Sequence, residues 1–232
     1  MPASKPTPRQ RAHARTRDEI LAAAHKELAA RGADGLSLRA VAREVEMVSS
    51  AIYRYFPSKD DLLTALIIES YDAVGEATEQ ATGGRAAYGR RFVRGCDAFR
   101  DWGHAHPHEY ALLYGSPVPG YRAPQETIVP AARTTVALLR VVEQAHLEGA
   151  LGPRAPLPPA SGPLRRQCHA LSEALATDLP EDVLLRFAHA WSQIFGLVSL
   201  DLFGQTVGTF DPADALAAHS FRTAATQLGL RP

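Results

Sequence analysis

LSLRAVAREVEMVSSAIYRYFPSK occupies residues 36–59 and predicts two short helices separated by a turn of three or four residues. Ser37 can cap the first helix, which we expect to run through Val45, and the second is expected from Ser49 to Phe56. Ala42 is small where the two helices would cross. The residues spaced to fill the core around them are Val41, Val45, Ile52 and Phe56. This pattern is typical of a helix-turn-helix motif.

Longer helices are predicted on both sides of this motif. Thr16, followed three residues later by Glu19, is a good start for the upstream helix, and Gly32 is expected to end it. Pro57 and Ser58 can cap a downstream helix from Lys59 to about Ala81. The apolar face of the upstream helix consists of Ile20, Leu21, Ala24 and Leu28.

The second helix of the motif has an outward polar face that we interpret as the surface in contact with DNA. Its members are Ser49, Ser50, Tyr53, Arg54 and Tyr55. An α-helix fits the major groove, where Arg54 could reach guanine O6 and N7 or a phosphate. Ser37 and Lys59 stand at helix starts, where free N–H groups attract phosphate, and Arg39 completes the candidate set.

A basic arm, residues 1–15, precedes the predicted helices and could be disordered. Its cations, together with Arg17, are not interrupted by an acidic residue before Asp18, and they could follow phosphates or enter a minor groove. Residues 1–60 contain 11 Lys and Arg against 7 Asp and Glu, whereas the rest of the chain contains 14 against 18. The basic residues of the arm are Lys5, Arg9, Arg11 and Arg15.

Residues 16–66 resemble the DNA-binding domain of the TetR family of bacterial regulators. The run from Ala51 to Leu63 is similar to that family's recognition helix and the start of its fourth helix, and Leu38–Glu44 is similar to its second helix. The turn departs from the family, which usually has Gly, an apolar residue and then Ser or Thr where this chain has Glu46, Met47 and Val48. Glu46 would occupy a conformation that Gly adopts at about 1 kcal/mol less cost, and Ser49 would take over the capping from Val48.

The remainder of the chain also predicts helices and no strands, so we expect an all-α fold. The domains expected are the arm, a DNA-binding domain over residues 16–62, and an effector-binding and dimerisation domain over residues 63–232. Two Pro/Gly-rich stretches, Gly115–Pro124 and Gly149–Pro163, predict loops, of which the second could be disordered. Helices are predicted near residues 85–105, 107–114, 126–149, 164–176, 180–204 and 212–228.

The resemblance implies that the larger domain binds an effector and forms a homodimer through its last two long helices. The helix from Pro180 to Gly204 carries an apolar stripe too broad for one core, which favours a subunit interface over burial within one subunit. Residues 191–204 and 101–114 resemble a TetR subgroup named for a Trp-His-Gly signature, although Phe195 stands where that signature has His.

Seven residues are predicted to line an effector cavity, with ordinary core packing as the alternative for each. They are Phe99, Trp102, His106, Tyr110, Tyr114, Leu138 and Trp191. A second cluster, His104, His106, His108 and Glu109, suggests a metal site, but Pro107 interrupts it and the spacing fits no regular ligand pattern.

We therefore expect a sequence-specific transcriptional regulator that uses no cofactor and is not an enzyme. It would be a repressor that binds near-palindromic double-stranded DNA and is released by a small molecule. The alternatives are a ligand-independent DNA-binding dimer, and a helical metal-binding protein or enzyme that uses residues 104–109. Cys96 and Cys168 fit neither a metal pattern nor a disulfide framework. No secretory signal and no stretch approaching about 20 apolar residues is evident, so we expect a cytoplasmic protein.

Overall fold

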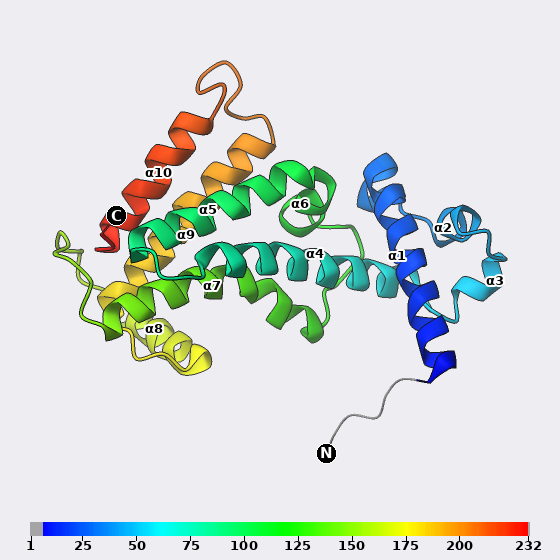
Figure 1. Cartoon of the computed structure of the whole chain (residues 1–232), viewed down its shortest axis with the longest axis horizontal. Helices are drawn as coiled ribbons and strands as arrows, with labels where there is room; N and C mark the ends of the chain where they lie inside the picture. Colours follow the sequence, from blue (N-terminus) through cyan, green and yellow to red (C-terminus); the bar gives the residue numbers. More distant parts are fainter. Residues whose placement is uncertain (1–6, 232) are drawn as a thin grey trace. The chain divides into compact units, whose positions relative to one another are not determined.

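The computed structural model describes residues 7–231, which form α-helices and one 3-10 turn without a strand (Figure 1). The described residues divide into two compact units: residues 7–72 pack with residues 106–131, and residues 73–105 pack with residues 132–231. The elements in order are α1 (Pro8–Gly35), α2 (Leu38–Glu44), α3 (Ser49–Ile52), α4 (Lys59–Thr82), α5 (Tyr88–Ala105), α6 (Pro107–Tyr114), η1 (Gln125–Thr127), α7 (Ile128–Leu147), α8 (Gly162–Leu175), α9 (Glu181–Leu202) and α10 (Asp214–Gln227).

Helix α1 begins eight residues before the predicted start at Thr16, so the described part of the basic arm is helical. Thr7 Oγ1 accepts a hydrogen bond from the backbone N–H of Gln10, and Gln10 Oε1 accepts one from the backbone N–H of Thr7. Pro8 occupies the first helical position, where its missing N–H costs nothing. This capping box explains the earlier start. Lys5 lies outside the described residues.

The first unit has a single apolar core to which α1, α2, α3 and α4 all contribute. Ile20, Val41 and Ile52 are fully buried, and Val45 packs against the cluster from its edge. The predicted core of the helix-turn-helix is therefore confirmed. Gly32 ends the regular part of α1 with φ 68°, and one further turn leads to the start of α2.

The turn between α2 and α3 is a Schellman motif. Glu46 has φ 54°, its N–H donates to Arg43 O (3.1 Å), and the N–H of Met47 donates to Ala42 O (2.8 Å). The expectation that Glu46 takes a conformation favoured by Gly is confirmed. Val48, not Ser49, holds the N-cap position of α3, and no side chain caps that helix. Ser49 is the first helical residue because the αL residue ends α2 two residues before Val48.

Glu46→Gly is expected to raise the free energy of unfolding by about 0.5 kcal/mol, since relief of αL strain exceeds the added entropy of the unfolded chain. Urea denaturation of the full chain measures the change. Glu44→Gly is the matched control, because Glu44 is helical and this change should lower stability by about 1 kcal/mol. A fall in stability for Glu46→Gly would contradict the assignment of strain to this turn.

In the second unit α10 packs against both α5 and α9, and α5 also packs against α9. Gly95 of α5 makes room for two neighbours: a Cβ at this position would lie 2.6 Å from Thr82 Cγ2 and 2.7 Å from Leu138 Cδ2. Contacts this short do not occur between real atoms, so α4, α5 and α7 approach as closely as they do only because residue 95 has no side chain.

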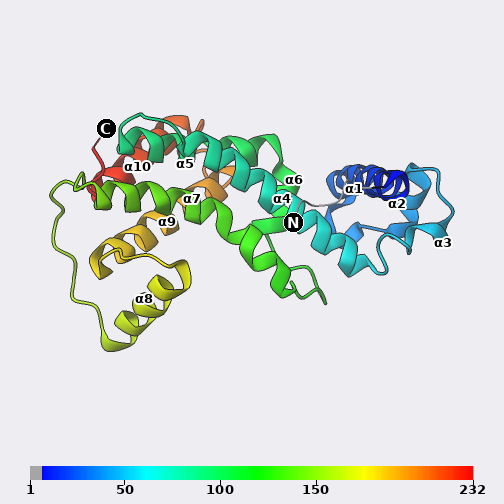
Figure 2. The ribbon, with the colours of Figure 1, turned by 60° about the horizontal axis from the view of Figure 1, so that its bottom comes forward.

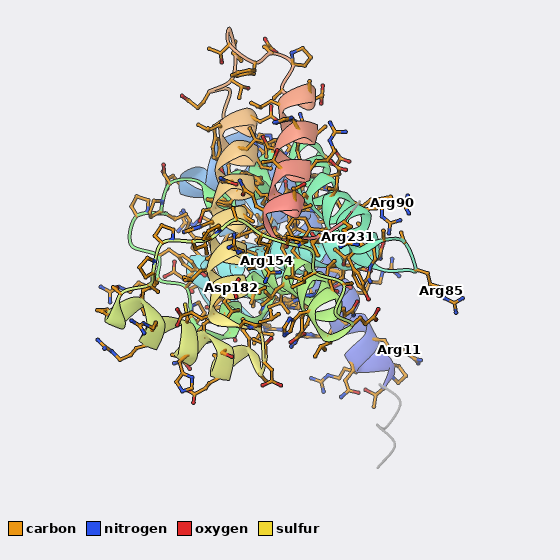
Figure 3. All side chains as sticks on the ribbon, turned by 90° about the vertical axis from the view of Figure 1, so that its left-hand side faces the viewer. Arg11, Arg85, Arg90, Arg154, Asp182 and Arg231 are labelled. Atoms are coloured by element: carbon orange, nitrogen blue, oxygen red, sulfur yellow. The ribbon has the colours of Figure 1, made fainter. Side chains whose placement is uncertain are left out.

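The long connection between α7 and α8 (Figure 2) is bonded to α9 and to the segment after α10. Arg154 lies beside Asp182 (Figure 3), with Nη2 3.4 Å from Asp182 Oδ2. Arg186 donates to the carbonyl of Ala155, and the N–H of Gly152 donates to Gly229 O at 2.8 Å. These contacts fix the loop over Gly149–Pro163, which the sequence suggested could be disordered.

Helix α9 is long and apolar enough, by length and composition, to cross a membrane, and it is the only described helix that is. The expectation that no stretch of the sequence approaches a membrane span of about 20 apolar residues was therefore too strict. The same test is passed by core helices, and α9 buries Val183, Phe187, Ile194 and Val198 against the rest of the second unit. Its predicted apolar stripe is thus divided between a buried part and an exposed part that includes Phe203.

Candidate DNA-binding interface

The recognition helix is shorter than predicted. Regular helix covers only α3, and the chain continues to Phe56 in tight hydrogen-bonded turns, with the N–H of Tyr55 donating to Ile52 O at 2.9 Å. Pro57 disfavours helical backbone at the residue before it, which explains why the helix does not reach Phe56. Because Ile52 and Phe56 are buried, the segment is fixed on its inner side and leaves one face free.

Four predicted DNA contacts lie together on that free face: Ser49, Ser50, Tyr53 and Arg54 are all exposed. Val48 beside them is 71% exposed and adds an apolar group able to contact a thymine methyl. From the sequence, Val48 was predicted only to be unable to cap the helix. Two hydroxyls, a phenol, a guanidinium and an apolar side chain are the groups that read base edges and phosphates.

Tyr55 differs from this set because it is half-buried and packed against α1. Its ring stacks on His13 with a centroid separation of 4.6 Å, and the guanidinium of Arg17 lies 5.2 Å from the centroid of the Phe56 ring. These contacts fix the end of the recognition segment against the N-terminal turns of α1. These N-terminal turns extend α1 beyond its predicted start at Thr16, and we call them the helical extension. The sequence signal for the helical extension was Thr7-Pro8-Arg9-Gln10, a capping box with Pro at the first helical position.

The helical extension presents cations next to the recognition segment. Arg9, Arg11, Arg15 and Arg17 are all exposed, and Arg11 projects from the first turns of α1 in Figure 3. Arg15 also pairs with Glu19 at 3.0 Å. A rigid helix holds these charges at fixed positions, so it loses less entropy on meeting phosphate than a disordered arm would.

The three predicted residues at helix starts have different surroundings. Ser37 holds the N-cap position of α2 without a side-chain cap bond, and Arg39 is exposed on its first turn. Lys59 is half-buried and its ammonium donates to Asp34 O at 2.8 Å. Lys59 therefore ties the start of α4 to the segment before α2, a structural bond that the sequence did not predict. Ser58 caps α4 by accepting from the N–H of Asp61 at 3.1 Å.

A titratable cluster joins three helices of the first unit and was not found from the sequence. His25 of α1 lies with Nδ1 3.0 Å from Glu109 Oε1 of α6 and with Nε2 3.5 Å from Glu69 Oε2 of α4. Hydrogen bonding to Glu69 raises the pKa of His25 above its ordinary value of 6.5, burial opposes this, and the charge of Glu69 and the contact with Glu109 add to it. The pKa of Glu69 is lowered, chiefly by the same hydrogen bond.

This cluster predicts a pH-dependent contribution to stability. The raised pKa of His25 gives stability that is complete below about pH 6.5 and is lost as the pH rises through the folded-state pKa. The lowered pKa of Glu69 gives stability that is lost as the pH falls below about 4.5. We expect His25→Gln to destabilise the protein by about 1 kcal/mol near pH 6 and by clearly less near pH 9.

Urea denaturation of both proteins at these two pH values measures the difference. His146→Gln on α7 is the matched control, and its effect should not follow the same profile. A His25→Gln effect that is constant from pH 6 to pH 9 would contradict a charged His25.

The predicted effector-lining residues belong to both compact units. Phe99, Trp102, Leu138 and Trp191 belong to the second unit, whereas His106, Tyr110 and Tyr114 belong to the first. Phe99 and Leu138 are fully buried, the Phe99 and Trp191 rings lie 5.4 Å apart, and Tyr110 and Tyr114 are in ring contact at 4.9 Å. His106 is exposed at the start of α6. None of these seven residues lines the groove between α5 and α10, the groove under residues 151–160 or the pocket between α1 and α6.

The His104–Glu109 cluster separates into different environments. His104 Nε2 lies 2.9 Å from Asp201 Oδ2 in the second unit, and Glu109 contacts His25 in the first. His108 lines a small pocket with residues of α1. No group of three or more His, Cys, Asp or Glu among residues 7–231 has an arrangement that could hold a metal ion.

A three-helix core that exposes a polar recognition face beside a basic helix defines a helix-turn-helix DNA-binding protein. Two family comparisons agree with this class. Residues 20–66 match the family described as bacterial regulatory proteins, tetR family, and residues 92–224 match the tetracyclin repressor-like C-terminal domain. The chain belongs to the TetR family of transcriptional regulators, and it is not an enzyme.

Individual relatives support the assignment over most of the chain. The HTH-type transcriptional regulator Rv1816 of Mycobacterium tuberculosis is 33% identical over 190 residues, which cover 81% of this chain and 80% of that protein. The crystal structure of the regulatory protein SCO4313 is 30% identical, covers 95% of this chain and 100% of its own, and superposes with a TM-score of 0.78. A Rhodococcus sp. RHA1 protein of unknown function shares the fold at 23% identity and a TM-score of 0.65, covering 96% and 97% of the two chains.

Proposed function

We propose that the protein is a cytoplasmic repressor whose homodimer binds a near-palindromic operator and is released by a small-molecule effector. The observation that carries the operator part is the exposed set Ser49, Ser50, Tyr53 and Arg54, held on a buried core. In a symmetric dimer two such faces would enter successive major grooves about 34 Å apart.

Dimerisation is supported by apolar surface at the end of α9. Leu200 is 50% exposed and Phe203 is 43% exposed, and Val207 and Phe210 in the following turn are more exposed still. Gly196 on the same helix has open space where a side chain would stand. Exposed large apolar side chains near the end of α9 favour contact with a second copy, and the family resemblance supports the same helices.

A ligand-independent DNA-binding dimer is the second candidate function. It is favoured by the packing of the predicted effector residues, since Phe99, Tyr110 and Leu138 have no exposed surface and fill the cores of their own units. An effector would then have to bind elsewhere or displace packed side chains, which costs free energy.

Selection of genomic DNA fragments by the purified protein, followed by footprinting, tests the proposal. We expect a near-palindromic site, two chains per site by sedimentation, and affinity that falls steeply with salt. Binding without a preferred site would contradict a sequence-specific regulator. Release of the selected DNA by a compound from a metabolite library would separate the effector-responsive regulator from the ligand-independent dimer.

A further inference from the structure

A groove of about 370 Å³ lies between the start of α5 and the end of α10 in the second unit. Its walls are largely apolar and include Gly89, Val93, Ala225 and Leu230. The backbone N–H of Gly89 donates to Arg231 O at 2.9 Å, which joins the start of α5 to the segment after α10. The volume is within the range of small-molecule sites, about 300–1,000 Å³. The remaining lining residues are Arg90, Arg94, Arg222 and Thr226.

All the charged side chains that line this groove are cationic. Arg90 and Arg94 are one helical turn apart on α5, and Arg222 faces them from α10. Arg94 donates one N–H to Gly83 O at 3.0 Å, and the charge of Arg222 also acts on Asp97 outside the lining. Arg90 projects into solvent (Figure 3), and among residues 7–231 it has no hydrogen-bond or ion-pair partner. Cations beside apolar walls attract an anion more strongly than the same cations on an open surface.

Two other cavities lack this combination. The groove of about 710 Å³ under residues 151–160 contains two arginines, Arg154 and Arg186, but both lie within 3.5 Å of Asp182 Oδ2. One further nitrogen of each bonds to a carbonyl of the loop. The pocket of about 240 Å³ between α1 and α6 in the first unit places Asp34 beside Arg31. In both, the carboxylate offsets the positive charge that would recruit an anion.

We propose that the groove between α5 and α10 binds a small amphipathic anion. The apolar part of this ligand packs on Val93, Ala225 and Leu230. Its carboxylate, sulfonate or phosphate group binds Arg90 and Arg222. Guanidinium groups suit these anions because their planar N–H pairs match two oxygens at once. The site is separate from the residues predicted to line an effector cavity, and it goes beyond the proposed function, since binding here does not require a change in DNA affinity.

Calorimetric titration of the full chain with 1-naphthaleneacetate and with its neutral amide tests the site. The two probes share one apolar body, so their difference reports the anion contact. We expect the carboxylate to bind about tenfold more tightly than the amide at low salt. The double variant Arg90→Gln, Arg222→Gln should remove that difference while changing amide binding by less than about twofold. Val93→Trp should fill the groove and weaken both probes.

Arg85→Gln is the matched control, because Arg85 is exposed just before α5 and does not line the groove. Circular dichroism confirms that each variant is folded. Equal affinity for the two probes, or carboxylate binding that survives both the arginine double variant and Val93→Trp, would overturn the proposal. So would conversion of a dimer to a monomer by Val93→Trp, because the groove would then be filled by a second copy. Operator binding is a separate measurement, so failure here leaves the proposed function unaffected.

Discussion

Replacing both Tyr53 and Arg54 with alanine is expected to weaken operator binding about a hundredfold at constant salt. Both side chains are exposed on the recognition face, so their removal leaves the buried core of Ile52 and Phe56 intact. A lost guanidinium contact to a base or phosphate and a lost phenol contact each account for about 1–2 kcal/mol. The loss should therefore appear in affinity and not in the melting temperature.

Fluorescence anisotropy with the footprinted operator measures this effect. Arg166→Ala, an exposed arginine on α8, is the control and should leave affinity within about twofold of the wild type. Arg54→Ala alone distinguishes the kind of contact: loss of a base contact relaxes preference at one position, whereas loss of a phosphate contact lowers the salt slope by about one. Wild-type affinity in the double variant would show that another face of the protein meets DNA.

The helix-turn-helix could be predicted because its determinants are local. Apolar spacing placed Val41, Ile52 and Phe56 in the core, and the departure of the turn from the family pattern pointed to Glu46, whose φ of 54° confirms the strain. Two of the errors in this region are also local. The effect of Pro57 on the length of α3 and the capping box at Thr7 were both readable from residue order.

Contacts between distant residues could not be predicted in the same way. His25 and Glu109 are 84 residues apart, and the sequence contains no signal that pairs them. Glu109 was instead grouped with its neighbours His104 and His108, which the fold places in other surroundings. Residues close in sequence around Pro107 belong to different units, so their proximity along the chain did not indicate the contacts of His104 and Glu109.

The predicted effector residues are ambiguous for a different reason. Aromatic and apolar side chains at helical spacing are equally suited to a cavity wall and to a core, and the choice depends on how closely the helices approach. Gly95 allows Thr82 and Leu138 to meet α5 at short distance, which places Leu138 in a packed core. In contrast, the α5–α10 groove is lined by arginines whose positions on two separate helices gave no sequence pattern.

Asp201→Ala is expected to lower the free energy of unfolding by about 3 kcal/mol, because it removes the carboxylate on which α5 and α9 converge. Arg100 Nε donates to Asp201 Oδ2 at 2.7 Å and His104 Nε2 lies 2.9 Å from the same oxygen. The side chains of Arg100 and Asp201 are only 14% and 11% exposed. Without Asp201, a guanidinium largely removed from water would keep only its bond to Asp214, whose side chain is 70% exposed.

Asp214→Ala is the matched control for the same guanidinium. It removes an exposed partner, so its cost should be about 0.5 kcal/mol. Although burial opposes it, hydrogen bonding from His104 and Arg100 lowers the pKa of Asp201 below its ordinary value of 3.8, so the stabilisation is present above that pH and is lost only as the pH falls through the folded-state pKa. Urea denaturation at pH 7 should therefore show the full difference between the two variants. Equal effects would mean that Asp201 does not fasten α9 to α5, and that the proposed subunit-contact helix is held by apolar packing alone.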